Sequence, residues 1–224
     1  RHTARVDVGL LVPVVAVVAA LAVGGAAYRL ERRRAAALRA FATEQGWSLV
    51  RRDDTWAREL DGEPFGRGSG RRCEDVLTGT FRGRDVVAFA YSYRTHTTDG
   101  NGQRQTRVHR YSVALLRLPA PLPLVELQAS WLPRVFSRGI ELESEDFNAR
   151  YRVRADDPRL AYDVLPARTM QLLLERPDVA VRLHGGCAVT WEAGRLDPEE
   201  LLVRLETVSG LLDGVPSFVW KDRA

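Results

Sequence analysis

Few residues in this chain of 224 have side chains whose type and spacing could support catalysis or metal binding. The sequence holds two cysteines and four histidines, and the two types come closest in RLHGGCAVTW, from Arg182 to Trp191. A histidine beside a cysteine could activate the thiol as a nucleophile, or the pair could supply half of a metal site. The third interpretation is a tight turn, because two glycines separate His184 from Cys187.

The pattern of apolar residues around the glycines favours the turn. A two-residue turn at Gly185 and Gly186 would mix apolar and polar side chains on each face, which a half-buried sheet avoids. A three-residue loop from His184 to Gly186 instead places Leu183 and Cys187 opposite each other on one apolar face, with Gly186 left-handed. We therefore predict a hairpin in which Cys187 is a core residue and His184 lies at the loop tip.

Other arrangements in the sequence match no familiar type of site. Cys73 and Cys187 lack the close cysteine spacing of a zinc site, and the histidines form no HExxH or similar group. The glycine-rich stretch from Glu59 to Arg72 lacks the lysine of a P-loop and is predicted as a mobile loop. We therefore predict no catalytic residue, no metal ligand and no cofactor. An enzyme with an unrecognised site stays open as an alternative.

The basic charge of the chain is concentrated near its N-terminus. The formal net charge is +4, but residues 1–52 hold nine arginines and only three acidic residues, so the remainder is slightly acidic. Lys221 is the only lysine. Bulk charge therefore does not indicate a phosphate-binding surface, and we expect no nucleic acid as a partner.

Residues 8–28, VGLLVPVVAVVAALAVGGAAY, form an uncharged apolar run of 21 residues. As a helix that rises about 1.5 Å per residue, this run would extend roughly 30 Å, the thickness of a bilayer core. We predict a transmembrane helix over 8–28, with an N-terminal flank at 1–7 and a basic juxtamembrane helix at 29–46. A secretory signal peptide is the alternative.

Arginines flank the apolar run unequally. Two precede it and five follow it, which favours a single-pass cell-membrane protein whose C-terminal domain faces the cytoplasm. A reversed anchor with an extracytoplasmic domain stays open. Small residues at Ala16, Ala20 and Gly24 also leave a homo-oligomer open. Four arginines that follow the run could contact lipid headgroups of the bilayer: Arg29, Arg32, Arg33 and Arg34.

The remainder of the chain is predicted as an α+β domain over residues 47–216, an antiparallel β-sheet covered by C-terminal helices, with a C-terminal tail at 217–224. Strand-like alternation fills its first part. Helix starts follow later, at Asp157, Pro166 and Asp197, where a capping residue or a first-turn proline begins each apolar periodic stretch.

A long hairpin closed by Gly100-Asn101-Gly102 is the clearest strand pairing. Its register places Tyr91 opposite Tyr111 and Tyr93 opposite His109 on one face. The tip of this hairpin is basic and could contact lipid phosphates or an acidic protein partner. The residues of this candidate surface are Arg94, His96, Arg104, Arg107 and Arg110.

Residues 147–174, FNARYRVRADDPRLAYDVLPARTMQLLL, place Phe-Asn before an aromatic and basic strand, then Asp-Pro-Arg-x-Ala and a leucine-ended helix. This segment resembles uncharacterised actinobacterial membrane proteins with one N-terminal span and one α+β domain. The similarity extends from about Phe81 to Pro216 and implies architecture without an activity. We predict a membrane-anchored domain that binds or scaffolds a protein partner at the inner membrane face.

Overall fold

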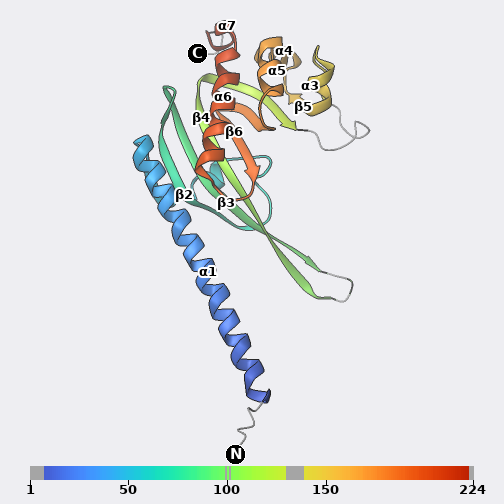
Figure 1. Ribbon diagram of the computed structural model, residues 1–224. Helices are drawn as coiled ribbons and strands as arrows, with labels where there is room; N and C mark the ends of the chain where they lie inside the picture. Colours follow the sequence, from blue (N-terminus) through green and yellow to red (C-terminus); the bar gives the residue numbers. More distant parts are fainter. Residues whose placement is uncertain (1–7, 99, 101, 130–138, 222–224) are drawn as a thin grey trace, which may run out of the picture. The chain divides into compact units, whose positions relative to one another are not determined.

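The computed structural model describes residues 8–98, 100, 102–129 and 139–221, with backbone alone for residues 8–20 and 27 (Figure 1). The chain divides into two compact units, Arg1–Phe41 and Ala42–Ala224. The second unit is an α+β domain with an antiparallel sheet and helices, which confirms the predicted fold class of this part of the chain.

Helix α1, Val8–Gln45, is continuous over 38 residues and is followed by Gly46. Gly46 has a φ of +67°, the left-handed conformation that commonly terminates a helix after its last turn. The side chains of residues 8–20, which make up most of the predicted transmembrane span, lie outside the description. Among the described residues, no helix has an apolar stretch long enough to cross a membrane.

Six strands form one antiparallel sheet within the described residues. The strands are β1 (Ser48–Arg52), β2 (Ser69–Phe81), β3 (Arg84–Thr98), β4 (Arg104–Ala129), β5 (Tyr151–Ala155) and β6 (Ala180–Ala193). Pairing runs in the order β1-β2-β3-β4-β5, and β6 also pairs with β4. The 26-residue strand β4 therefore joins three other strands and is the centre of the domain. Strand β4 continues without a break past Leu118.

Strand β6 is a single strand, so the predicted hairpin at His184–Gly186 is wrong. Cys187 pairs with Arg117 of β4, and Gly185 pairs with Leu122, with register shifts on both sides of Leu122. Three prolines of β4 in this region have no N–H for regular pairing. On β6, Gly185 adopts a left-handed backbone conformation with a φ of +54°. The two glycines therefore belong to a bulged region and do not reverse the chain.

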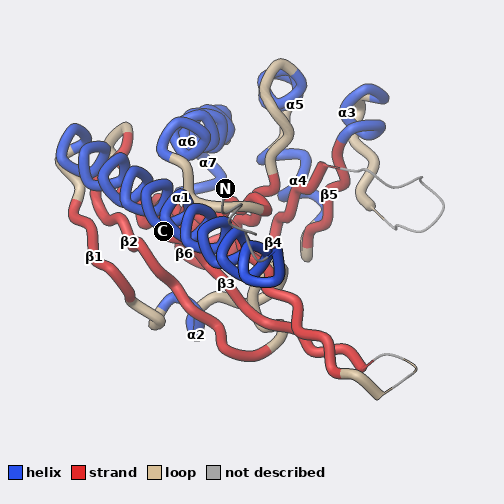
Figure 2. The backbone as a smooth tube through the Cα atoms, turned by 60° about the horizontal axis from the view of Figure 1, so that its bottom comes forward, coloured by secondary structure: helices blue, strands red, loops and turns tan. Residues whose placement is uncertain are grey.

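Helices cover both faces of the sheet. The helices are α2 (Trp56–Glu59), α3 (Glu145–Arg150), α4 (Pro158–Val164), α5 (Ala167–Leu174), α6 (Pro198–Gly214) and α7 (Ser217–Lys221). Figure 2 shows α5 and α6 on one side of the strands and α2 on the other. The predicted caps are confirmed, because Asp157 accepts from the backbone N–H of Arg159, and Asp197 accepts from those of Glu199 and Glu200.

Two segments differ from their predicted character. The glycine-rich stretch before β2 contributes Phe65 to the core, where its side chain is only 2% exposed, and β2 already begins at Ser69. The stretch predicted as a C-terminal tail contains α7, whose Val219 is fully buried. Phe65 and Val219 are buried because they pack against the rest of the domain. A local sequence pattern does not show such contacts between distant parts of the chain.

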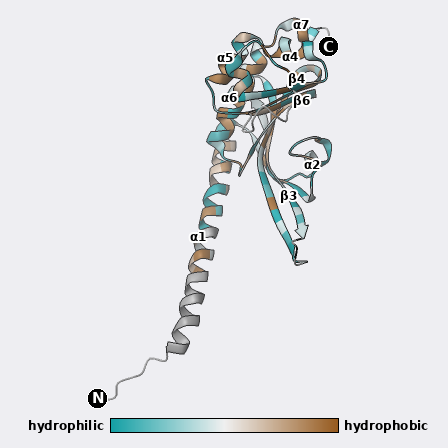
Figure 3. Ribbon diagram, turned by 90° about the vertical axis from the view of Figure 1, so that its right-hand side faces the viewer, coloured by the Kyte–Doolittle hydropathy of each residue, from teal (hydrophilic) through white to brown (hydrophobic). Residues whose placement is uncertain are grey.

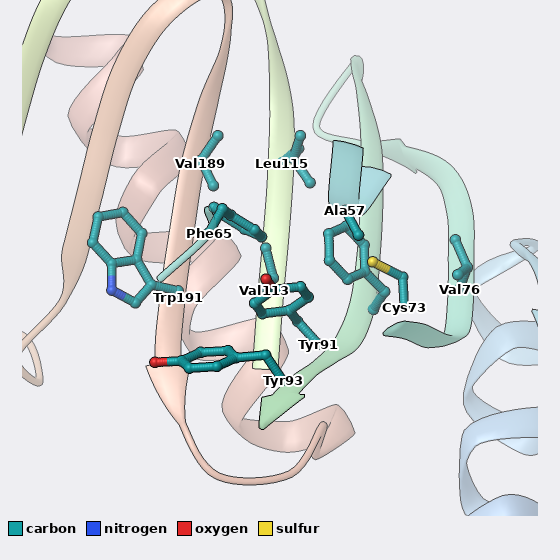
Figure 4. Close-up of a cluster of buried hydrophobic side chains, with 11 residues drawn as sticks. Ala57, Phe65, Cys73, Val76, Tyr91, Tyr93, Val113, Leu115, Val189 and Trp191 are labelled. Carbon is teal, nitrogen blue, oxygen red and sulfur yellow. The ribbon is translucent and has the colours of Figure 1, made fainter. Parts of the chain in front are cut away.

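A cluster of buried side chains fills the face of the sheet on the α2 side (Figure 4). Tyr91 and Tyr93 of β3 lie beside Phe65 and Trp191, and the Phe65 and Tyr91 ring centroids are 4.9 Å apart. On the opposite face, Arg204 of α6 is buried and donates to the carbonyl of Ser112 at 2.8 Å and to its hydroxyl at 2.5 Å. These contacts fix the base of the β3–β4 hairpin on both sides.

Candidate functional site

The hairpin of β3 and β4 extends beyond the other strands of the sheet (Figure 1). Pairing of β2 with β3 ends at Arg94, and pairing of β6 with β4 ends at Tyr111. Beyond these positions the two strands pair with each other, apart from a hydrogen bond from the N–H of Gly194 to the carbonyl of Arg110 at 2.9 Å. We call residues 94–98 and 104–110 the arm; Figure 3 shows that the end of the hairpin is mostly hydrophilic. The arm is a two-stranded ribbon, and among the described residues its outer edges are open beyond Arg94 on β3 and before Arg110 on β4.

The predicted register of this hairpin is confirmed along its length. Tyr91 pairs with Tyr111 and Tyr93 with His109, and the last described pair is Thr98 with Arg104. Gly102 has a φ of +77°, the left-handed conformation predicted for it. Residues 99 and 101 lie outside the described residues.

Side chains of the five predicted contact residues divide between the two faces of the arm. Because side chains alternate along each strand, Arg94 and His96 of β3 share one face with Arg104 and Arg110 of β4. Arg107 lies on the opposite face with His109. The first face also carries Val108, an apolar side chain that is 41% exposed and that the sequence analysis did not single out.

All four arginines of the arm are exposed. None of them forms an ion pair with another residue in the described part of the chain. Three of these positive charges lie around Val108 on one face. A surface of this composition is complementary to an acidic surface that also offers an apolar contact.

Aromatic side chains stiffen the base of the arm. The ring of His109 stacks on Tyr93 at 4.7 Å between centroids, and Tyr93 stacks on Tyr111 at 6.1 Å. The three rings are nearly parallel, and Tyr93 continues into the buried cluster through Tyr91 at 5.9 Å (Figure 4). Burial, with a hydrogen bond to Tyr93, raises the pKa of Tyr111 to about 12, so its hydroxyl stays neutral at physiological pH.

Both histidines of the arm are engaged with hydroxyl groups. Nδ1 of His96 lies 2.9 Å from Oγ1 of Thr106 across the ribbon, and Nε2 of His109 lies 2.9 Å from Oγ1 of Thr95. Because the two imidazoles occupy opposite faces, they cannot share a metal ion. In the described part of the chain, no three histidine, cysteine or acidic side chains come together as a metal site.

The stretch that contains His184 and Cys187 forms no thiol–imidazole contact among its described groups. The thiol of Cys187 lies 3.8 Å from the backbone carbonyl oxygen of His184. Cys187 is partly buried at the margin of the cluster, a less central position than the predicted core residue. Burial raises the pKa of its thiol, which disfavours the thiolate needed for nucleophilic attack.

The four predicted headgroup residues, Arg29, Arg32, Arg33 and Arg34, all lie on α1 with exposed side chains. Arg34 contacts Glu31 at 3.4 Å, and the guanidinium of Arg32 lies 5.7 Å from the centre of the Tyr28 ring. A helix turns 100° per residue, so consecutive arginines point in different directions. They surround the helix and do not form one flat basic face.

Comparison with known proteins gives one informative similarity. Neither a protein-family model nor a curated protein sequence matches the chain. A solved structure, described as the mycobacterial trehalose monomycolate transport factor A, TtfA, superposes with a TM-score of 0.58 at 12% identity. The match covers 80% of this chain and 92% of TtfA. At this identity the similarity shows a shared fold. The actinobacterial origin of TtfA agrees with the resemblance found in the sequence.

Proposed function

We propose that this protein is a single-pass membrane protein whose α+β domain binds an acidic surface of a protein partner through the arm. The observation that carries the proposal is the set of exposed arginines around Val108 on a ribbon with two open edges. An isolated two-stranded ribbon is marginally stable in water, so an extended one is favoured where it gains contacts with a partner.

The proposed anchor rests on the apolar run and on α1. The run at residues 8–28 is uncharged, and α1 continues through it without a break. Leu21 and Val23, at the end of the run, are each 70% exposed, an arrangement that a bilayer would stabilise and water would not. The arginine excess after the run supports a domain on the cytoplasmic side, with Arg29 and Arg32–Arg34 near the headgroups.

The similarity to a transport factor supports an accessory role for this fold rather than a catalytic one. The described residues likewise present an exposed basic surface on the arm. A protein that recruits or positions another component at the membrane needs only the anchor and the arm. We therefore prefer a binding or scaffolding function to an enzymatic one.

The test uses a photo-crosslinking amino acid at Val108 in the full chain, expressed in its native membrane. We expect one protein to crosslink at this position. A variant with Arg94→Glu, Arg104→Glu and Arg110→Glu should reduce the product about tenfold, since each exposed charge contact contributes up to about 1 kcal/mol. The matched control reverses three exposed arginines outside the arm: Arg51, Arg117 and Arg176.

The alternative occupant of the arm is an anionic lipid surface. Crosslinking of lipid alone at Val108, or equal loss of product in the control variant, would overturn the proposed protein partner. Binding of the full chain to vesicles with and without phosphatidylglycerol distinguishes the two, because reversal of the arm arginines weakens vesicle binding only if the arm contacts lipid.

A further inference from the structure

The outer edge of β4 loses its neighbouring strand where the arm begins. Strand β6 covers this edge up to the pair of Tyr111 with Ala193, and the N–H of Gly194 then donates to the carbonyl of Arg110 at 2.9 Å. Gly194 has a φ of +135°, a backbone conformation that favours glycine, and the chain leads from there into α6. Among the described residues, no strand pairs with this edge of β4 between Arg104 and Val108.

The hydrogen bond from Gly194 determines which backbone groups of the arm point to the open edge. In an antiparallel strand the N–H and C=O of one residue point to the same side, and successive residues alternate between the two sides. The carbonyl of Arg110 points to the β6 side, and the pairing of β3 with β4 runs through the arm without a register shift. The even-numbered residues Arg104, Thr106 and Val108 therefore direct their N–H and C=O groups outward, and the odd-numbered residues between them pair with β3.

The outer edge of β3 offers a shorter run of open backbone groups than the edge of β4. The start of β2 lies along it, because Ser69 pairs with Arg94 and its hydroxyl oxygen lies 3.4 Å from Nε2 of His96. A Cβ at Gly68 would lie 2.4 Å from the carbonyl oxygen of Arg94, so the backbone before β2 approaches this edge closely. The edge of β4 is therefore the better position for a further strand.

Side chains beside the open edge indicate the composition of such a strand. Directly opposite residues of neighbouring strands contact each other on one face of the sheet. The exposed Val108 favours an apolar residue opposite it, and the exposed Arg104 favours a carboxylate. These two positions are four residues apart, so the apolar and acidic residues of the added strand are also four apart. A second copy of the arm fits poorly, because it would bring its own arginines against Arg104 and Arg110.

We propose that the partner of the arm contributes an extended acidic segment that adds to the sheet as a strand on the outer edge of β4. This inference rests on the proposed function of the arm and specifies the form of the partner. The segment pairs with Arg104, Thr106 and Val108 and continues the row that β6 occupies along the same edge. In recognition by strand addition, main-chain hydrogen bonds provide affinity and the alternate side chains provide specificity.

The test places a proline on the open edge of the full chain and measures photo-crosslinking at Val108 in the native membrane. Thr106→Pro removes an outward N–H that the ribbon itself does not use, and we expect about tenfold less product. Thr106→Val keeps this N–H and loses only the hydroxyl that contacts His96, so crosslinking should not change. Thr98→Pro is the matched proline control, because the N–H of Thr98 points to the opposite edge, and it should also leave crosslinking unchanged.

Undiminished crosslinking in Thr106→Pro, or an equal loss in Thr98→Pro, would overturn the strand addition. A product formed by two copies of this chain would overturn it as well. The proposed function fails separately, if reversal of the arm arginines leaves the product unchanged.

The unsubstituted arm gives a second measurement that does not depend on how well a proline variant folds. Mass spectrometry of the crosslinked product should locate the attachment in a partner segment with an acidic residue four positions away. Attachment to a segment without such a residue would contradict the proposed pairing with Arg104.

Discussion

Glu126 and Arg182 form an ion pair across β4 and β6, with Oε2 and Nε 3.0 Å apart and both side chains nine-tenths buried. The pair joins two strands whose residues are more than fifty positions apart in sequence, and Arg182 extends it to the backbone before β2. Removal of one member leaves the other charge buried without its partner. Removal of one member is therefore expected to cost more stability than the disruption of an exposed pair would.

Arg182→Met is expected to lower the free energy of unfolding by about 3 kcal/mol, because it leaves the buried Glu126 carboxylate without its nearest cation and with only the more distant, exposed Arg154. Glu126→Leu combined with Arg182→Met should recover part of this loss, since no buried charge remains. Urea denaturation of the full chain in detergent measures both variants. An Arg182→Met protein as stable as the native one would show that water reaches the pair.

Substitutions at the two adjacent glycines of β6 distinguish the observed bulged strand from the hairpin predicted by the sequence. Gly185 has a φ of +54° and Gly186 does not have a positive φ, and a Cβ added at either position would have no neighbour within 4 Å. Gly185→Ala should therefore destabilise the domain by about 1–2 kcal/mol through backbone strain alone. Gly186→Ala should change stability by less than about 0.5 kcal/mol. Thermal unfolding of the two variants measures this difference. A larger loss of stability in Gly186→Ala than in Gly185→Ala would support the predicted hairpin instead.

Close packing between Trp47 and β2 gives a third prediction. A Cβ at Gly79 would lie 2.1 Å from the indole ring, whose Nε1 donates to the carbonyl of Thr80 at 3.0 Å. Gly79→Ala should displace the ring and cost about 1–3 kcal/mol of stability. The intrinsic fluorescence of Trp47 should change with it, measured in a background where the other tryptophans are phenylalanine. Unchanged stability and fluorescence would contradict this contact.

Alkaline pH should destabilise the domain through its buried acids. Burial, reinforced by the carboxylates of Asp54 and Asp53, raises the pKa of Cys73 from 9.0 to about 12. Burial raises the pKa of Tyr91 from 10.0 to about 12. Between pH 9 and 12 the unfolded chain releases these protons while the folded chain retains them, so the free energy of unfolding falls as pH rises.

Tyr91→Phe tests the alkaline effect with little change in shape. The hydroxyl of Tyr91 is buried with no hydrogen-bond partner among the described residues, so its removal should be neutral or stabilising by up to about 1 kcal/mol near pH 7. The decline in stability above pH 10 should also become shallower. Denaturation curves at pH 7 and pH 10.5 measure both effects, and a steeper decline in the variant would refute the assignment.

Topology is tested by reporters fused after Ala224. The arginine excess after the apolar run predicts a cytoplasmic C-terminus. A cytoplasmic reporter should therefore be active and a periplasmic-type reporter inactive. Moving arginines from the 29–34 segment to positions before residue 8 should reverse both signals. Activity of the periplasmic-type reporter in the native sequence would overturn the proposed location.

Local signals in the sequence were sufficient for the β3–β4 hairpin. Alternation of Tyr91 and Tyr93 with polar residues, together with a glycine turn, determines a register between neighbouring segments. The same reasoning failed for Cys187, because its true partner is Arg117, which is distant in sequence. A run of apolar alternation around two glycines is equally compatible with a hairpin and with a bulged strand.

The ion pairs of Glu126 could not be predicted from the sequence for the same reason. Glu126, Arg154 and Arg182 become neighbours only when β5 and β6 both pair with β4, and arginine is too common in this chain to mark any one position. Caps at Asp157 and Asp197 were predictable because they act within one helix turn. Phe65 was assigned to a loop, since the glycines around it concealed its contact with Tyr91.

The pairing of β4 also affects how the chain folds while it is being synthesised. One edge of β4 can pair with β3 as soon as both have left the ribosome, whereas the other edge must wait for β6. Pro119, Pro121 and Pro123 each lack an N–H and lie between Arg117 and Val125, where the pairing of β4 with β6 shifts register. Over this stretch the strand offers fewer backbone donors to a neighbouring chain than a regular strand would, which disfavours aggregation before β6 is synthesised.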